Sequence, residues 1–268
     1  METGDMERIG LIAAMASESQ ALVRRIKTYH RVAVGKYRDV AFQVGDRECV
    51  LVISGMGIRK AADAARRLIE AYHPQCLLSF GIAGAVRPDL RIGDVVMAAR
   101  NGTLENGTVV ESQPLARLSE KSWQAVRQSL DEDGIRSYSG TAITTSGSQI
   151  VLLDEALPFP ILEMETAGLI QVARENQVPL IVLRAISDNP QAPLPLDLAA
   201  VMDENSRLIF SRLLKELFKH PGILLRSGRM LQNSRIAADS AALAVITALQ
   251  QGEPLIEPAS IQTDSLSV

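Results

Sequence analysis

The stretch ILEMETAGLIQVARENQVPLIVLRAISDNP, residues 161–190, predicts a strand, a helix and a second strand, with a carboxylate where the chain leaves each strand. The opening run ends at Glu165, and apolar residues then recur at helical spacing as far as Ala173. The run PLIVLRAI is apolar enough for a strand buried on both faces, and Ser187 and Asp188 follow it at once. Because ligands bind at the carboxyl ends of parallel strands, Glu165 and Asp188 are predicted to line a functional crevice.

Composition limits the class of protein. The 268 residues, 47% apolar and 22% charged, fit a globular chain of one large domain or two small ones. A net charge of −3 argues against a nucleic-acid partner, which needs clustered Lys and Arg. Three His without metal-binding spacing predict no metal site, and two Cys exclude a disulfide framework, which favours the cytoplasm. We also expect neither a signal peptide nor a membrane span.

Predicted strands alternate with helices along the chain. Strands are expected over residues 9–14, 37–42, 49–53, 75–80, 91–98 and 138–145, and helices over residues 59–72, 114–133, 147–155 and 198–219. A further helix follows the first strand, with Ser17 as its cap and Glu18 in its first turn. This alternation predicts a mostly parallel sheet that helices cover on both faces.

The chain changes character after residue 221. Residues 224–249 predict a helix with Arg226, Arg229 and Arg235 in its first half and an apolar face in its second half. We expect this helix to pack on the domain or on a partner subunit. The alternative is a basic amphipathic helix that touches a membrane surface.

The acids carry more information than the glycine loops. Glycines follow three predicted strands, but residues 55–60 lack the third glycine of a dinucleotide fingerprint, so no nicotinamide or flavin cofactor is expected. Glu18, Glu165 and Asp188 all follow strands of one predicted sheet and can face one crevice. Buried carboxylates raise each other's pKa, which suits a general acid beside a general base. The alternative is that Glu18 supports a helix N-terminus and Asp188 caps a turn.

Six motifs carry a family resemblance: AAMASES, SGMGIRKAADAA, FGIAGAV, RIGDVV, LEMETAGLIQVA and VLRAISDNP, in this order. Together they resemble the nucleoside phosphorylase superfamily, most closely the nucleosidase branch that includes methylthioadenosine/S-adenosylhomocysteine nucleosidases. The resemblance covers residues 8–218, which leaves residues 219–250 as a helical extension and residues 251–268 as a disordered tail. It implies a single-domain, three-layer α/β/α fold around a twisted mixed, mostly parallel sheet, without a cofactor, and a homodimer.

The resemblance also implies an activity, the cleavage of the N-glycosidic bond of a purine nucleoside with release of adenine. Asp188 matches the acid that protonates purine N7, Glu165 the acid that accepts hydrogen bonds from both ribose hydroxyls, and Glu18 the base that activates water. The other implied substrate-pocket residues are Met15, Gly81, Ile82, Ile150, Val151, Glu163, Met164, Arg184 and Ser187. Among them, the backbone at Ile150 and Val151 is expected to read the adenine edge.

Departures from the family pattern bear on the substrate. Ile82 stands where many relatives have Ser or Thr, and Ser148 stands where nucleosidases have Asp. Together with the short segment 100–113 and the C-terminal addition, they resemble the hopanoid-associated members, which release adenine from adenosylhopane. A lipid-linked substrate would give the C-terminal helix a reason to touch a membrane. The alternatives are methylthioadenosine/S-adenosylhomocysteine cleavage and cleavage of another purine nucleoside.

The nucleophile is a separate question. The first loop, residues 13–17, lacks the arginine with which phosphorylases of this superfamily bind phosphate, and Glu18 would repel a phosphate dianion. Arg59 is the nearby candidate for a phosphate contact. We therefore expect water rather than phosphate to attack the sugar. The competing class is a nucleoside-binding module without turnover.

Overall fold

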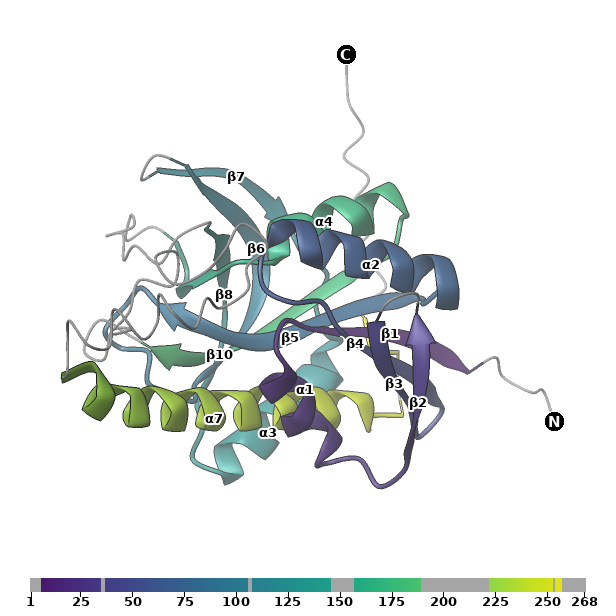
Figure 1. Cartoon of the computed structure of the whole chain (residues 1–268), viewed down its shortest axis with the longest axis horizontal. Coiled ribbons are helices and arrows are strands. Elements are labelled where there is room, and N and C mark those ends of the chain that lie inside the picture. Colours follow the sequence, from purple (N-terminus) through teal and green to yellow (C-terminus); the bar gives the residue numbers. More distant parts are fainter. Residues whose placement is uncertain are drawn as a thin grey trace, which may run out of the picture.

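The computed structural model describes residues 6–34, 37–105, 108–145, 157–188, 222–252 and 254–256. These residues form one mixed sheet with helices on both faces (Figure 1). The strands are β1 (Glu7–Ala13), β2 (Tyr29–Val34), β3 (Tyr37–Val44), β4 (Arg47–Ile53), β5 (Cys76–Ala85), β6 (Val95–Glu105), β7 (Thr108–Pro114), β8 (Ser137–Thr144), β9 (Pro160–Glu163) and β10 (Leu180–Asp188). The helices are α1 (Ala16–Val23), α2 (Ile58–Tyr72), α3 (Glu120–Glu132), α4 (Thr166–Glu175) and α7 (Gly222–Leu249).

The sheet closes partly on itself. Its strand order is β10-β6-β8-β9-β5-β1-β4-β3-β2, and β10 also pairs with β5, so that five strands form a ring. Parallel pairings join β1 to β4 and β5, β5 to β10, and β8 to β6 and β9. Antiparallel pairings join β2 to β3, β3 to β4, β5 to β9, β6 to β7 and β6 to β10. The predicted mixed sheet is confirmed, although antiparallel pairings are as frequent as parallel ones.

Two apolar cores flank the sheet. On one face, α2 and α4 pack against each other and against side chains such as Leu77 and Val182. On the other face, α1, α3 and α7 cover side chains such as Leu78 and Leu183. Because successive side chains of a strand point to opposite faces, the continuous apolar runs of β5 and β10 supply both cores. This explains why the central strands read as uninterrupted hydrophobic segments.

Helix α7 packs on the domain through its second half. Small side chains at Ala237, Ala241, Ala244 and Ala248 are fully buried against the sheet, where α7 contacts β10, α1 and α3. The guanidinium of Arg47 donates to the carbonyl of Leu249 (2.9 Å) and to that of Gln251, and so satisfies carbonyl groups at the end of the helix. Packing on the domain is therefore confirmed for this half of the helix.

The end of the chain differs from the expectation of a disordered tail from residue 251. Leu255 is fully buried, and Ile256 forms an antiparallel bridge to Leu118. Leu255 belongs to the core that α3 covers, and Ile256 packs against it. The Pro and Ser residues of this segment gave no indication of such packing. The boundary at residues 218/219 remains a prediction because residues 189–221 lie outside the described ranges. None of the helices in the described ranges is long and apolar enough to cross a membrane.

Candidate active site

Three acids follow strands that each pair with β5. Glu18 lies in the first turn of α1 after β1, Glu165 is the N-cap residue of α4 after β9, and Asp188 is the last residue of β10. The end of β5 lies between them, since Gly84 pairs with Asp188 on one side and with Leu162 on the other. The three acids therefore lie around the second half of β5, and the crevice between them remains a prediction.

Glu18 reaches from α1 to β5. Its side-chain oxygens accept hydrogen bonds from the backbone N–H groups of Met15 (2.8 Å) and Ile82 (3.0 Å), and the residue is only 2% exposed. Burial raises its pKa, while the two N–H groups and the charge of Arg184 oppose the rise. Both interpretations of Glu18 are therefore compatible with its contacts, because it supports the start of α1 and also faces the strand end.

Glycine at two positions of β5 makes room for the acids. A Cβ atom at Gly81 would lie 2.4 Å from Glu18 Oε1, and one at Gly84 would lie 2.8 Å from Asp188 Oδ2. Any larger residue at either position would displace a carboxyl group. The glycines that the sequence presents as a loop are instead part of a strand, where they let two acids approach its backbone.

Glu165 retains acceptor capacity although it is buried. It is 8% exposed, and its oxygens accept hydrogen bonds from the N–H groups of Gly57 (2.9 Å) and Met164 (3.4 Å). With one donor to each oxygen from the described residues, lone pairs remain for two hydroxyl groups of a ligand. Burial raises the pKa of Glu165 to about 7, and the negative charges of Glu163 and Glu18 add to the rise while Arg184 opposes it.

Glu163 does not face the crevice. Its side chain is 0% exposed and accepts from Arg184 Nη2 at 3.2 Å. It also accepts from the side-chain hydroxyls of Thr144 and Thr166 and from the N–H groups of Glu165 and Thr166. A carboxylate has about four acceptor positions, so this set leaves none for a substrate. The predicted substrate contact of Glu163 is therefore wrong, because the chain itself satisfies the side chain.

Arg184 and Asp188 occupy different places on β10. The guanidinium of Arg184 is buried and donates to Ser79 Oγ (3.1 Å) and Glu163. Asp188 accepts a hydrogen bond from Ser187 Oγ at 2.7 Å. Burial raises the pKa of Asp188, and the bond from Ser187 opposes the rise. A raised pKa favours the protonated form, which a general acid needs.

The predicted pocket residues fall into two neighbouring groups on β5. Glu18, Glu165 and Arg184 lie close enough for their charges to act on one another. The backbone around them is that of Met15, Gly81, Ile82 and Met164. Ser187 and Asp188 lie further along, beside Gly84. Ile150 and Val151, like Ser148, lie outside the described residues. Sequence reasoning missed Gly57, Ser79, Asn101 and Thr144. Thr144 ends β8, so the strand-end rule would have found it had it been applied to hydroxyl residues.

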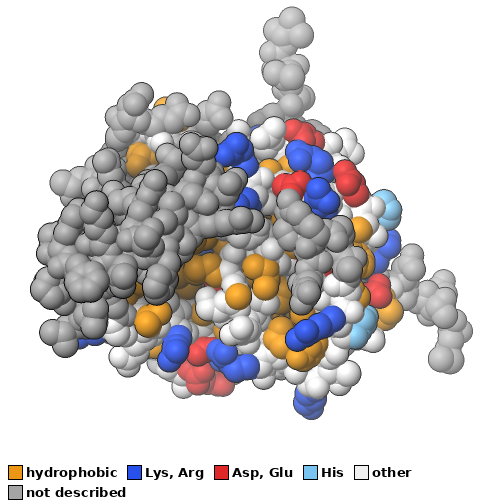
Figure 2. Space-filling view, viewed as in Figure 1, with side chains coloured by type: hydrophobic (Ala, Val, Ile, Leu, Met, Phe, Trp, Pro, Cys, Tyr) orange, Lys and Arg blue, Asp and Glu red, His pale blue; other side chains and the backbone are white. Residues whose placement is uncertain are grey.

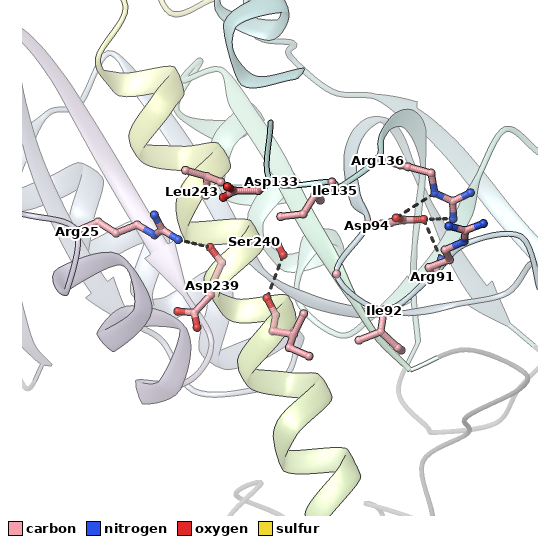
Figure 3. Close-up of a pocket in the computed structure, with 13 residues that line it drawn as sticks. Arg25, Arg91, Ile92, Asp94, Asp133, Ile135, Arg136, Asp239, Ser240 and Leu243 are labelled. Carbon is pink, nitrogen blue, oxygen red and sulfur yellow. Dashed lines mark hydrogen bonds and ion pairs between the residues drawn. The ribbon is translucent and has the colours of Figure 1, made fainter. Parts of the chain in front are cut away.

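The motif RIGD holds the end of β10 from outside the site. The backbone of Gly93 and Asp94 exchanges two hydrogen bonds with Ile186, at 2.8 and 2.9 Å, two residues before Asp188. The Asp94 side chain accepts from the N–H of Arg91 and from the guanidinium of Arg136. A groove of about 460 Å³ lies beside this turn and α7 (Figure 3), and the three candidate acids are not among its lining residues.

The described part of the chain contains no candidate metal site. No group of three or more His, Cys, Asp or Glu side chains there could hold a metal ion.

Comparison with known proteins places the chain in a family. The family described as the Phosphorylase superfamily matches residues 8–219. A 5'-methylthioadenosine/S-adenosylhomocysteine nucleosidase of Shewanella piezotolerans is 30% identical over 199 residues, 68% of this chain and 86% of that protein.

Solved structures share the fold. An S-adenosylhomocysteine nucleosidase of Streptococcus pyogenes, in complex with 5-methylthiotubericidin, has a TM-score of 0.66 at 23% identity and covers 95% of this chain and 100% of its own. A futalosine hydrolase of Helicobacter pylori has a TM-score of 0.64 at 18% identity and covers 90% and 97%.

Proposed function

The chain belongs to the phosphorylase superfamily, and we propose that it is a nucleosidase that hydrolyses the N-glycosidic bond of an adenine nucleoside. The observation that carries the proposal is the set of three acids around the end of β5, two of them buried and Asp188 partly buried, all with raised pKa values. The curated relatives, named as nucleosidases, support the same reaction. This activity is an N-ribosyl hydrolase activity, and it uses no cofactor.

In the proposed mechanism, each acid has one task. Protonated Asp188 gives its proton to N7 of the base, so adenine leaves as a neutral molecule and the ribosyl centre becomes oxocarbenium-like. Glu165 accepts hydrogen bonds from both ribose hydroxyls with its remaining lone pairs. Glu18 takes a proton from the water that attacks the sugar. Met164 lies against the sugar, and Ile150 and Val151 read the base.

The charges around the sugar favour water over phosphate. The negative charges of Glu163 and Glu18 raise the pKa of Glu165, and the positive charge of the Arg184 guanidinium lowers it. Arg184 is already bonded to Glu163 and Ser79. A phosphate dianion entering this cluster would face like charges in a low-dielectric site, where repulsion is strong. Phosphorolysis, with Arg59 as the phosphate contact, is the alternative.

The names of the relatives support methylthioadenosine or S-adenosylhomocysteine as substrate. Adenosylhopane is the second candidate, and the surface of α7 favours it. Leu231 and Ile236 are 56% and 43% exposed on this helix, close in sequence to Arg229 and Arg235, which suits contact with a membrane that holds a lipid-linked substrate. Figure 2 shows hydrophobic side chains among charged ones on the face that carries α7. The homodimer implied by the resemblance remains a prediction.

A substrate panel tests the function. Adenine release by the purified full chain is measured with methylthioadenosine, S-adenosylhomocysteine, adenosine and a lipid-linked adenosine, each with and without phosphate. We expect release that does not depend on phosphate. Release only with phosphate would show a phosphorylase, and binding of these nucleosides without release would show a binding module.

The pH dependence of nucleoside binding follows from Glu165. Its pKa of about 7 means that the ionised form, which accepts from both hydroxyls, is lost as the pH falls below about 7. We expect the dissociation constant of a 7-deaza-adenine nucleoside to rise by up to about tenfold per pH unit below that value. This analogue has a C–H group at position 7, so protonation of Asp188 does not enter the comparison. Calorimetric titration should show the rise in wild type and a flat profile in Glu165→Gln; a flat profile in wild type would be contradictory.

A further inference from the structure

Two polar residues, Thr144 and Asn101, form a buried hydrogen-bond network with Glu163, two residues before Glu165. Thr144 ends β8 and Asn101 lies on the neighbouring strand β6, and both are buried. Thr144 Oγ1 lies 2.6 Å from Glu163 Oε1 and 3.0 Å from Asn101 Oδ1, and it accepts the N–H of Ala167 at 3.0 Å. The hydroxyl thus touches the buried acid, the first turn of α4 and a second strand at once.

The number of protons and lone pairs on each group decides which atom donates and which accepts in these hydrogen bonds. A threonine hydroxyl has one proton and two lone pairs, and the short distance to Glu163 places the proton there. One lone pair then accepts from Ala167, and the other accepts from Asn101 when the amide NH2 group faces Thr144. Amide oxygen and nitrogen are assigned from such networks, and this orientation gives the contact between Thr144 and Asn101 one donor and one acceptor.

Glu163 connects Thr144 to Glu165 and to the start of α4. Its Oε2 accepts the N–H of Glu165 at 3.0 Å and that of Thr166 at 2.9 Å. These are orphan N–H groups at the start of α4, so the acid fixes where the helix begins and how the N-cap residue is oriented. Glu165 then reaches Gly57 across the site at 2.9 Å.

We propose that Thr144 and Asn101 are positioning residues for the ribose-binding carboxylate, and that they act on Glu165 through Glu163 without touching the substrate. The inference rests on the proposed function, since it assigns the support of the ribose contact.

The same strand offers a matched control. Thr141 lies three residues before Thr144 on β8, is 0% exposed, and its hydroxyl has no hydrogen-bond partner among the described residues. Thr141→Val and Thr144→Val therefore remove the same atom from the same strand. Only the second change removes the side-chain hydrogen bond from β8 to Glu163 and the acceptor for the N–H of Ala167 in α4.

The test is steady-state kinetics of adenine release from methylthioadenosine. We expect Thr144→Val to raise KM about tenfold with kcat within about threefold, because a misplaced ribose contact weakens substrate binding first. Thr144→Ser should restore KM, and Thr141→Val should match wild type in both constants. A general loss of packing would instead affect both valine variants, and serine would not rescue it.

The outcomes separate this inference from the proposed function. If wild type is inactive on every nucleoside of the panel, the function fails. If wild type is active but the two valine variants have the same KM, the positioning role is overturned. If Thr144→Val does not fold, Asn101→Ala gives the comparison, since it removes the amide and leaves the bond to Glu163. A KM raised at least threefold then supports the role, and an unchanged KM overturns it.

Discussion

Asp188→Asn should lower kcat for adenine release by about 10²–10⁴-fold, the range that general acid catalysis supplies. Asparagine has nearly the same shape, and its side-chain oxygen can still accept from Ser187 Oγ, which lies 2.7 Å from Asp188 Oδ1 in the wild type. It has no proton of suitable acidity for N7, so adenine would have to leave as an anion. Nucleoside binding should stay within about tenfold of wild type, which corresponds to about 1.4 kcal/mol.

The measurement combines an adenine-release assay with calorimetric binding of an uncleaved analogue. Asp239→Asn is the control, because Asp239 is an acid on α7 that is paired with Arg24 at 2.7 Å, away from the three candidate acids. This variant should behave like wild type. An Asp188→Asn enzyme that keeps its rate within threefold would remove Asp188 from the mechanism.

Glu18→Gln should cause a loss of similar size, about 10²–10⁴-fold in kcat, if Glu18 takes the proton from water. The glutamine amide has one oxygen for the two N–H groups of Met15 and Ile82, and it cannot act as a base at neutral pH. The same assay measures the effect, with thermal unfolding to follow the start of α1.

Glu120→Gln separates the two interpretations of Glu18. Glu120 has the same kind of position, in the first turn of α3, and it is exposed. A first-turn acid that only favours a helix contributes about 0.3–1 kcal/mol to stability and nothing to chemistry. If Glu18→Gln changes stability by that amount and leaves kcat unaltered, like Glu120→Gln, the catalytic role of Glu18 is excluded.

Strand-end acids were predictable from the sequence because the rule behind them is local. A buried apolar run followed by an acid identifies both the strand and the position of the acid at its carboxyl end, as at Asp188. The same reasoning placed Glu165 and Glu18 at one edge of the sheet. The substrate contact of Glu163 came from the family resemblance instead, and it is wrong because the folded chain turns this side chain inward and satisfies it.

The missed strands have a physical reason as well. β2 and β7 lie at the margins of the sheet, where polar residues such as Arg31 and Thr108 interrupt the apolar pattern. The glycine-rich end of β5 resembled a loop, yet its backbone pairs with β10 and β9. Residues 91–94 resembled a strand start but form a turn, because the side chain of Asp94 accepts the N–H of Arg91 at 2.8 Å.

The polar network behind the site could not be derived from the sequence. Thr144 bonds to residues 43 and 19 positions away, Asn101 and Glu163, and only the folded sheet brings them together. Partners this far apart leave no periodic signal, and a buried threonine looks the same in a sequence whether its hydroxyl is bonded, as in Thr144, or unbonded, as in Thr141.

The central claim is that Asp188 expels the base by protonating N7, and a 7-deaza-adenine nucleoside tests it most directly. This compound keeps the sugar contacts of Glu165 but has carbon in place of the nitrogen that receives the proton. We expect the full chain to bind it within about tenfold of methylthioadenosine, about 1.4 kcal/mol, and to release no base over the time in which methylthioadenosine is fully cleaved. Release of the 7-deaza base at a rate close to that of adenine would contradict the account.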